Sequence, residues 1–151
     1  MKYMVMSMAL CCSVALGGCA RRPALPPTAE VEYLGRTEPG TTYLQARGCA
    51  GGGPAAATQE ALRTAFETIL FRGIPGSEVS TPLVADETAA RQRFASYWQE
   101  FYGKGRYRTF LTSIAVAPGH QRGCSLVTLK INHAALRQEL EQQGITRRFG
   151  Y

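Results

Sequence analysis

The feature that most constrains this chain is an apolar segment near its start. Met4 to Leu16 is an almost unbroken apolar run that follows the positive Lys2 and ends in Leu16-Gly17-Gly18-Cys19. A run of this length fits the central region of an export signal and is too short to span a bilayer. Because such a signal is removed, we predict that residues 1–18 take no part in the folded domain.

The cysteine that closes this segment predicts a lipid anchor. Leu-small-small-Cys is the pattern that lipoprotein signal peptidases recognise, so we expect cleavage before Cys19 and acylation of its thiol. More than one acyl chain anchors a protein stably, because each buried CH₂ contributes ~0.8 kcal/mol. Ala20 follows the cysteine, and resemblance to Gram-negative lipoproteins then favours the outer membrane. An ordinary secretory signal with a coincidental cysteine is the alternative.

Residues 19–30 predict a tether between the anchor and one domain over residues 31–151. Three prolines between Pro23 and Pro27 make this segment stiff and extended. At ~3.1 Å per residue, Ala20 to Thr28 reaches roughly 28 Å. The domain is long enough for a single hydrophobic core.

The hydrophobic pattern of residues 31–151 predicts an α+β domain. Alternating residues indicate strands, and apolar residues three and four apart indicate helices. The order ββααββα favours a two-layer sandwich, in which an antiparallel sheet of about four strands carries helices on one face. The predicted strands are 31–36, 41–47, 106–117 and 124–132, the helices are 55–72, 86–102 and 134–143, and residues 145–151 are a candidate edge strand.

Side-chain size and pattern add detail to the first two predicted helices, 55–72 and 86–102. Ala57, Ala61 and Ala65 share one face of the first helix and allow a close approach to the sheet. The second helix carries an apolar stripe that we assign to the core rather than to a binding platform. Its members are Ala90, Phe94, Tyr97, Trp98, Phe101 and Tyr102.

Two cysteines, Cys49 and Cys124, remain in the predicted domain. An exported protein folds in an oxidising compartment, where an even pair favours a disulfide. If Leu44 and Val127 face the helices, strand alternation directs both sulfurs to the opposite face of the sheet. Free thiols and pairing with a partner protein are the alternatives.

The inventory of reactive side chains argues against an enzyme. His120 and His133 lie at no metal-ligand spacing, so we expect no metal and no cofactor. A nucleophile pair of Cys124 with His120 is conceivable, but the disulfide competes for the same sulfur. Gly51 to Gly53 before a helix could hold an anion, yet it matches no phosphate loop.

The net positive charge of the chain could give the domain a surface that binds partners. The chain has a net charge of +6, and loss of Lys2 with the signal leaves 16 basic and 11 acidic residues, a net charge of +5. Such a surface suits anionic partners or is simply solvated. Export argues against nucleic acid as a ligand. The candidate contact residues are Lys104, Arg106, Arg108, Arg147 and Arg148, together with the loop 74–84.

Several motifs resemble known envelope proteins. Tyr43-Leu-Gln-Ala-Arg-Gly-Cys-Ala50 with the alanine-rich helix resembles the small α+β domain of flagellar-associated surface lipoproteins and of flagellar assembly protein T; the glycines of 51–54 depart from it. Leu70-Phe-Arg-Gly-Ile-Pro-Gly76, Gly105-Arg-Tyr-Arg108 and Gly144-Ile-Thr-Arg-Arg-Phe-Gly150 are similar to short outer-membrane lipoproteins of the Bacteroidetes type. Neither resemblance implies a catalytic residue.

These observations predict a lipid-anchored envelope protein with a structural or protein-interaction role. The expected partners are the bilayer, through acylated Cys19, and another envelope protein. The alternatives are a binding module for an anionic cell-wall or lipopolysaccharide ligand and, third, a thiol enzyme or hydrolase.

Overall fold

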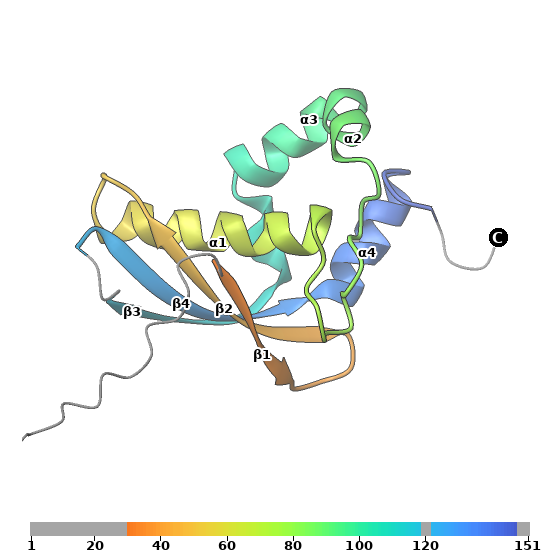
Figure 1. The fold of residues 1–151 in the computed structure, drawn as a ribbon. Coiled ribbons are helices and arrows are strands. Elements are labelled where there is room, and N and C mark those ends of the chain that lie inside the picture. Colours follow the sequence, from red (N-terminus) through yellow and green to blue (C-terminus); the bar gives the residue numbers. More distant parts are fainter. Residues whose placement is uncertain (1–29, 119–121, 148–151) are drawn as a thin grey trace, which may run out of the picture.

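The fold is centred on a sheet of four antiparallel strands (Figure 1). The structure is a computed structural model that describes residues 30–118 and 122–147. The spatial order is β1-β2-β4-β3, so β2 and β4 are central and β1 and β3 are edges. This is the predicted α+β sandwich with a four-stranded sheet. The strands are β1 (Val31–Arg36), β2 (Thr41–Cys49), β3 (Leu111–Pro118) and β4 (Cys124–Asn132).

Helix α1 (Pro54–Phe71) packs across the two central strands. Pro54 occupies its first turn, where a missing backbone N–H costs nothing. Ala57 and Ala61 are fully buried, and a Cβ at Gly48 of β2 would collide with their backbone. The predicted close approach is therefore confirmed, and it depends on a glycine as well as on the alanines.

The predicted helix 86–102 is divided into three short pieces. They are α2 (Glu87–Arg93), α3 (Ala95–Trp98) and a π-helical turn, η1 (Gln99–Gly103). The first break is at Phe94, with φ −118° and ψ 38°, and the Trp98 indole N–H donates to the Ala90 carbonyl at 3.0 Å. Side-chain packing thus overrides the local helical preference.

These pieces lie on the side of α1 away from the sheet (Figure 1). Their aromatic side chains meet those of α1, with ring centroids of Phe66 and Phe101 5.8 Å apart and those of Phe71 and Trp98 5.4 Å apart. The stripe belongs to the core, as predicted, although Phe94 and Tyr102 are only partly buried.

The strand predicted from Arg106 begins later, at Leu111. Residues Arg106–Phe110 form a 3₁₀ helix, η2, because Tyr107 and Phe110 are three apart and both point into the core. Helix α4 (His133–Gln142) follows β4 directly, and the Asn132 side chain accepts from Ala135 N–H at 2.9 Å as its N-cap.

One further expectation, the edge strand after α4, needs correction. Residues 145–147 form no strand, because Ile145 N–H returns to the Leu140 carbonyl at 2.9 Å and closes the end of α4; residues 148–151 lie outside the described ranges. The loop 74–84, predicted as a contact surface, is divided between the core and the surface. Its apolar residues Ile74, Val79, Leu83 and Val84 are buried in the core.

Candidate functional site

The least protected surface of the described domain is the edge strand β3. Its residues Ile114 and Val116 pair with Leu129 and Val127 of β4 and therefore face the side of the sheet that carries α1. Leu129 and Val127 are 0% exposed, whereas Ile114 is 47% and Val116 is 53% exposed. The apolar face of β3 thus extends beyond the cover that α1 provides.

The other edge of the sheet is protected. Strand β1 carries Glu32 and Arg36, and its pairing with β2 shifts between Tyr33 and Gly35. Charged side chains and bulges are the usual means by which sheet edges avoid other strands. Strand β3 has no charged side chain over eight residues. Its register with β4 also shifts, between Leu111 and Ser113, but this shift lies at the start of the strand, and the pairing is regular from Ser113 onward. Only β3 therefore has the character of an edge that accepts another strand.

Charge is distributed unequally around this edge. Residues 101–138 contain no Asp or Glu, and all eleven acidic residues lie elsewhere. Strand β3, strand β4 and η2 all belong to this carboxylate-free stretch. It carries six basic residues, Lys104, Arg106, Arg108, Arg122, Lys130 and Arg137.

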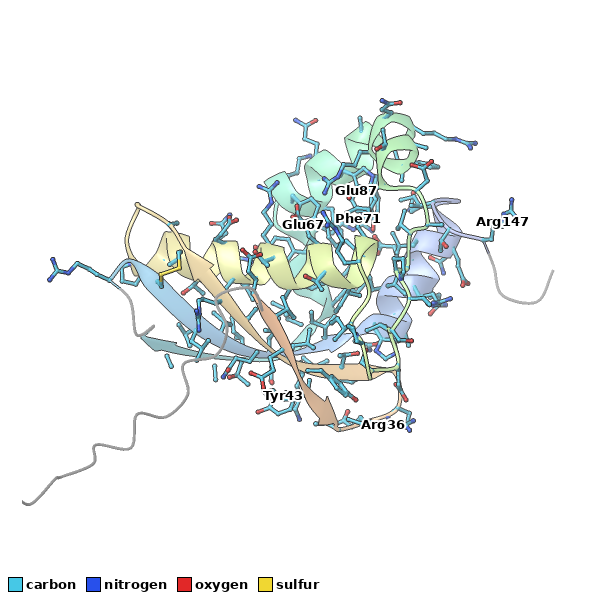
Figure 2. All side chains as sticks on the ribbon, in the orientation of Figure 1. Arg36, Tyr43, Glu67, Phe71, Glu87 and Arg147 are labelled. Carbon is cyan, nitrogen blue, oxygen red and sulfur yellow. A yellow bond between two sulfur atoms is a disulfide. The ribbon has the colours of Figure 1, made fainter. Side chains whose placement is uncertain are left out.

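The predicted contact residues come from two separate regions. Lys104 pairs with Glu100 at 2.9 Å and Arg106 with Glu139 at 3.2 Å, so both are ion-paired within the domain. Arg108 lies over the Tyr107 ring and is exposed. Figure 2 shows Arg147 at the end of the domain opposite the disulfide. The fifth residue, Arg148, falls outside the described residues.

The two domain cysteines form the predicted disulfide. Cys49 and Cys124 lie directly opposite each other at the end of the β2–β4 ladder, with their Cα atoms 4.1 Å apart. Because Gly48 and Ser125 are buried, alternation places both cysteines on the face away from α1, as expected. The disulfide occupies the sulfur that the conceivable Cys124–His120 pair would need; His120 itself lies outside the described residues.

A polar cluster around His133 was not foreseen from the sequence. The Thr42 hydroxyl lies 2.8 Å from His133 Nδ1, and Glu78 Oε2 lies 3.6 Å from Nε2. Arg36 in turn pairs with Glu78 at 2.7 Å. No local signal could reveal this cluster, because Thr42 and His133 are 91 positions apart.

Hydroxyl, imidazole and carboxylate in this order resemble an activated nucleophile. Thr42 is only 2% exposed, however, so a substrate has no access to its hydroxyl. Burial lowers the pKa of His133, the Glu78 carboxylate partly opposes that shift, and Arg137 adds to it. The His133 cluster is therefore a structural contact, the His133 clamp, that joins β2, the loop 74–84 and α4.

A second cluster fastens α2 to α1. Arg91 contacts Glu87 at 2.8 Å and Glu67 at 3.4 Å, and its guanidinium lies 4.6 Å from the Phe71 ring centre. Figure 2 shows Glu67, Phe71 and Glu87 converging where the two helices meet. Every charge here has an internal partner, so this cluster is structural.

The surface of the described residues includes two depressions. One, of about 500 Å³, lies beside α1, and the other, of about 460 Å³, lies between α2 and the end of α4. The first mixes acidic and basic side chains, unlike the mostly apolar lining of small-molecule sites. Its lining residues are Glu30, Arg47, Cys49, Glu60, Thr64, Glu67, Thr68 and Arg72.

Within residues 30–118 and 122–147, no group of three or more His, Cys, Asp or Glu side chains could hold a metal ion. None of the helices in these ranges is both long and apolar enough to cross a membrane. Comparison of the chain with protein-family models, curated proteins and solved structures found no match.

Proposed function

We propose that this chain is a lipoprotein of the bacterial envelope, anchored at the outer membrane through acylated Cys19, and that its domain acts by contact with another envelope protein rather than by catalysis. The observation that carries the contact role is the uncovered apolar edge of β3, with Ile114 and Val116 about half exposed. The Leu16-Gly17-Gly18-Cys19 pattern supports the anchor.

The disulfide and the resemblances support the same location. A Cys49–Cys124 bond is typical of proteins that fold in an oxidising compartment. Short outer-membrane lipoproteins of the Bacteroidetes type, and the small domains of flagellar surface lipoproteins, are the families to which we propose a relationship. In both cases the proposal is an envelope protein that works without a catalytic residue.

Metabolic labelling with a palmitate analogue tests the anchor. The native chain should incorporate label and sediment with membranes, and Cys19→Ser should lose both properties. Cys49→Ser/Cys124→Ser is the matched control, since it removes two thiols but leaves the acylation site. Equal labelling of the native and Cys19→Ser chains would reject the anchor.

Crosslinking in cells tests the contact role. A photoreactive amino acid at position 114 places the probe on the uncovered edge, and one at Gln59, which is exposed on α1, provides the control. We expect a reproducible crosslinked species from position 114 alone. Equal or absent crosslinking from the two positions would reject β3 as the contact surface.

A second candidate function is binding of an anionic cell-wall or lipopolysaccharide ligand, and the carboxylate-free stretch 101–138 is the observation that favours it. Charge-driven binding weakens as salt screens it. Binding of the purified chain to isolated wall material should then fall between 50 and 300 mM salt, roughly as expected from a Debye length near 10 Å at 0.1 M. Salt-insensitive or absent binding would remove this candidate.

A further inference from the structure

The hydrogen-bonding pattern of the sheet directs the backbone N–H and C=O groups of two β3 residues, Ile114 and Val116, away from β4. Bonded and non-bonded pairs alternate in an antiparallel ladder, and Ala50 N–H donates to the Gly123 carbonyl at 3.1 Å beside the β2–β4 ladder. This bond fixes the alternation, so odd-numbered residues of β4 bond to β2 and even-numbered ones to β3. Odd-numbered residues of β3 therefore bond to β4, and Ile114 and Val116 direct N–H and C=O away from the sheet.

The side chains of the same two residues define what an added strand must carry. Ile114 and Val116 lie on the α1 side of the sheet, about half exposed, while their neighbours on β4 are sealed. A strand paired with β3 would place its own residues beside them on that face. Apolar side chains at alternate positions of the added strand would therefore extend the core. On the other face of the sheet, the small side chains of Ala115 and Ala117 place no requirement on the residues of the added strand.

Charge at the two ends of β3 specifies the ends of the added strand. Arg108 lies just before β3 and Arg122 just after it, and no described carboxylate pairs with either. Antiparallel pairing of two β3 strands would bring the Arg108 end of one copy beside the Arg122 end of the other. Like charges would then meet at both ends, so a second copy fits this edge poorly and an acidic segment fits it well.

We propose that β3 binds an extended acidic segment of a partner protein as a fifth strand of the sheet. The segment carries apolar side chains at alternate positions and carboxylates at both ends. Its backbone pairs with Ile114 and Val116, and its carboxylates lie near Arg108 and Arg122. This inference rests on the proposed contact function and specifies the chemistry of the partner.

A synthetic peptide tests the proposal directly. The probe is fluorescein-labelled Glu-Glu-Thr-Val-Thr-Val-Thr-Val-Glu-Glu, and the control peptide has lysine in place of each glutamate. Binding is measured by fluorescence anisotropy against the full chain purified in detergent. We expect the acidic peptide to bind, to weaken as salt is raised, and to bind more tightly than the lysine peptide.

Three variants separate the backbone, the charges and a non-specific effect. Val116→Pro removes an outward N–H and leaves the β4 ladder intact, as edge strands tolerate, and should weaken acidic-peptide binding about tenfold. Arg108→Gln/Arg122→Gln should weaken it about fivefold and flatten its salt dependence. Arg93→Gln removes an exposed cation of α2 and should change nothing. Thermal unfolding checks that each variant remains folded.

Several results would overturn the proposal. They are equal binding of the two peptides, no binding of either, unchanged affinity in a folded Val116→Pro chain, and a dimer that sediments without peptide and is lost in Val116→Pro. The last result would make a second copy the occupant. Crosslinks from position 114 in cells without peptide binding would leave the contact function standing and reject only the acidic strand.

Discussion

Removing the Cys49–Cys124 bond should destabilise the domain through the chain entropy of its unfolded state. The bond closes a loop with a sequence separation of 75. For a loop of this length the chain-entropy model gives about 4.5 kcal/mol at 25 °C, and measured values are commonly 2–4 kcal/mol. We therefore expect Cys49→Ala/Cys124→Ala to lower the free energy of unfolding by roughly 2–4.5 kcal/mol. Cys49 is exposed, so its loss leaves no large cavity.

Urea unfolding of the full chain, followed by the fluorescence of the single Trp98, measures this difference well, because that side chain is 5% exposed in the folded state. Native chain in reductant should unfold at the same urea concentration as the double alanine variant. Intact mass should increase by two hydrogens on reduction. A difference below ~1 kcal/mol between the oxidised chain and the variant, with the bond present by mass, would refute the entropic reasoning.

Three further predictions concern packing, protonation and capping. Gly48→Ala should cost about 1–3 kcal/mol by forcing α1 away from β2, whereas Gly51→Ala, where a Cβ meets nothing within 4 Å, should stay within about 0.5 kcal/mol in the same urea assay. Because burial lowers the pKa of His133 in the folded chain, the unfolded chain takes up the proton first. Stability should therefore fall as pH drops below about 6.5, and His133→Gln should flatten that part of the profile of urea midpoint against pH. Asp86→Ala removes the side chain that accepts from Ala89 N–H at 2.9 Å and should lower the thermal midpoint by the equivalent of about 1 kcal/mol.

Local patterns predicted most of the elements and failed where side-chain packing decides the backbone. Strand β4 has the predicted bounds, because its alternation is uninterrupted from Cys124 to Asn132. The segment 86–102 has a helical pattern throughout, yet it breaks at Phe94, where Trp98 turns back to bond the Ala90 carbonyl. That bond depends on where α1 places Phe71, which no local pattern contains.

The candidate site divides in the same way. The Cys49–Cys124 bond was predicted from an even pair of cysteines in an exported chain, and strand parity agreed with it; the structure extends β2 to Cys49, so both ends of the bond lie on paired strands. The His133 clamp needed the positions of β2, α4 and the loop 74–84 at once. The basic contact residues were chosen by charge alone, and charge alone could not show that Lys104 and Arg106 already have carboxylate partners.

The exposure of β3 follows from dimensions that the sequence does not display. A helix with its side chains is about 10 Å wide and neighbouring strands are about 4.8 Å apart, so α1 can cover about two strands. Helix α1 covers β2 and β4, so the edge strands β1 and β3 need some other protection against pairing with a further strand. Strand β1 carries charges instead. Strand β3 has no charged side chain, and its register shift with β4, between Leu111 and Ser113, lies before Ile114 and Val116, where one lysine would have sufficed. An edge that is uncovered, uncharged and flanked by arginines with no carboxylate partner among the described residues is therefore better explained by a strand that binds there than by incomplete packing.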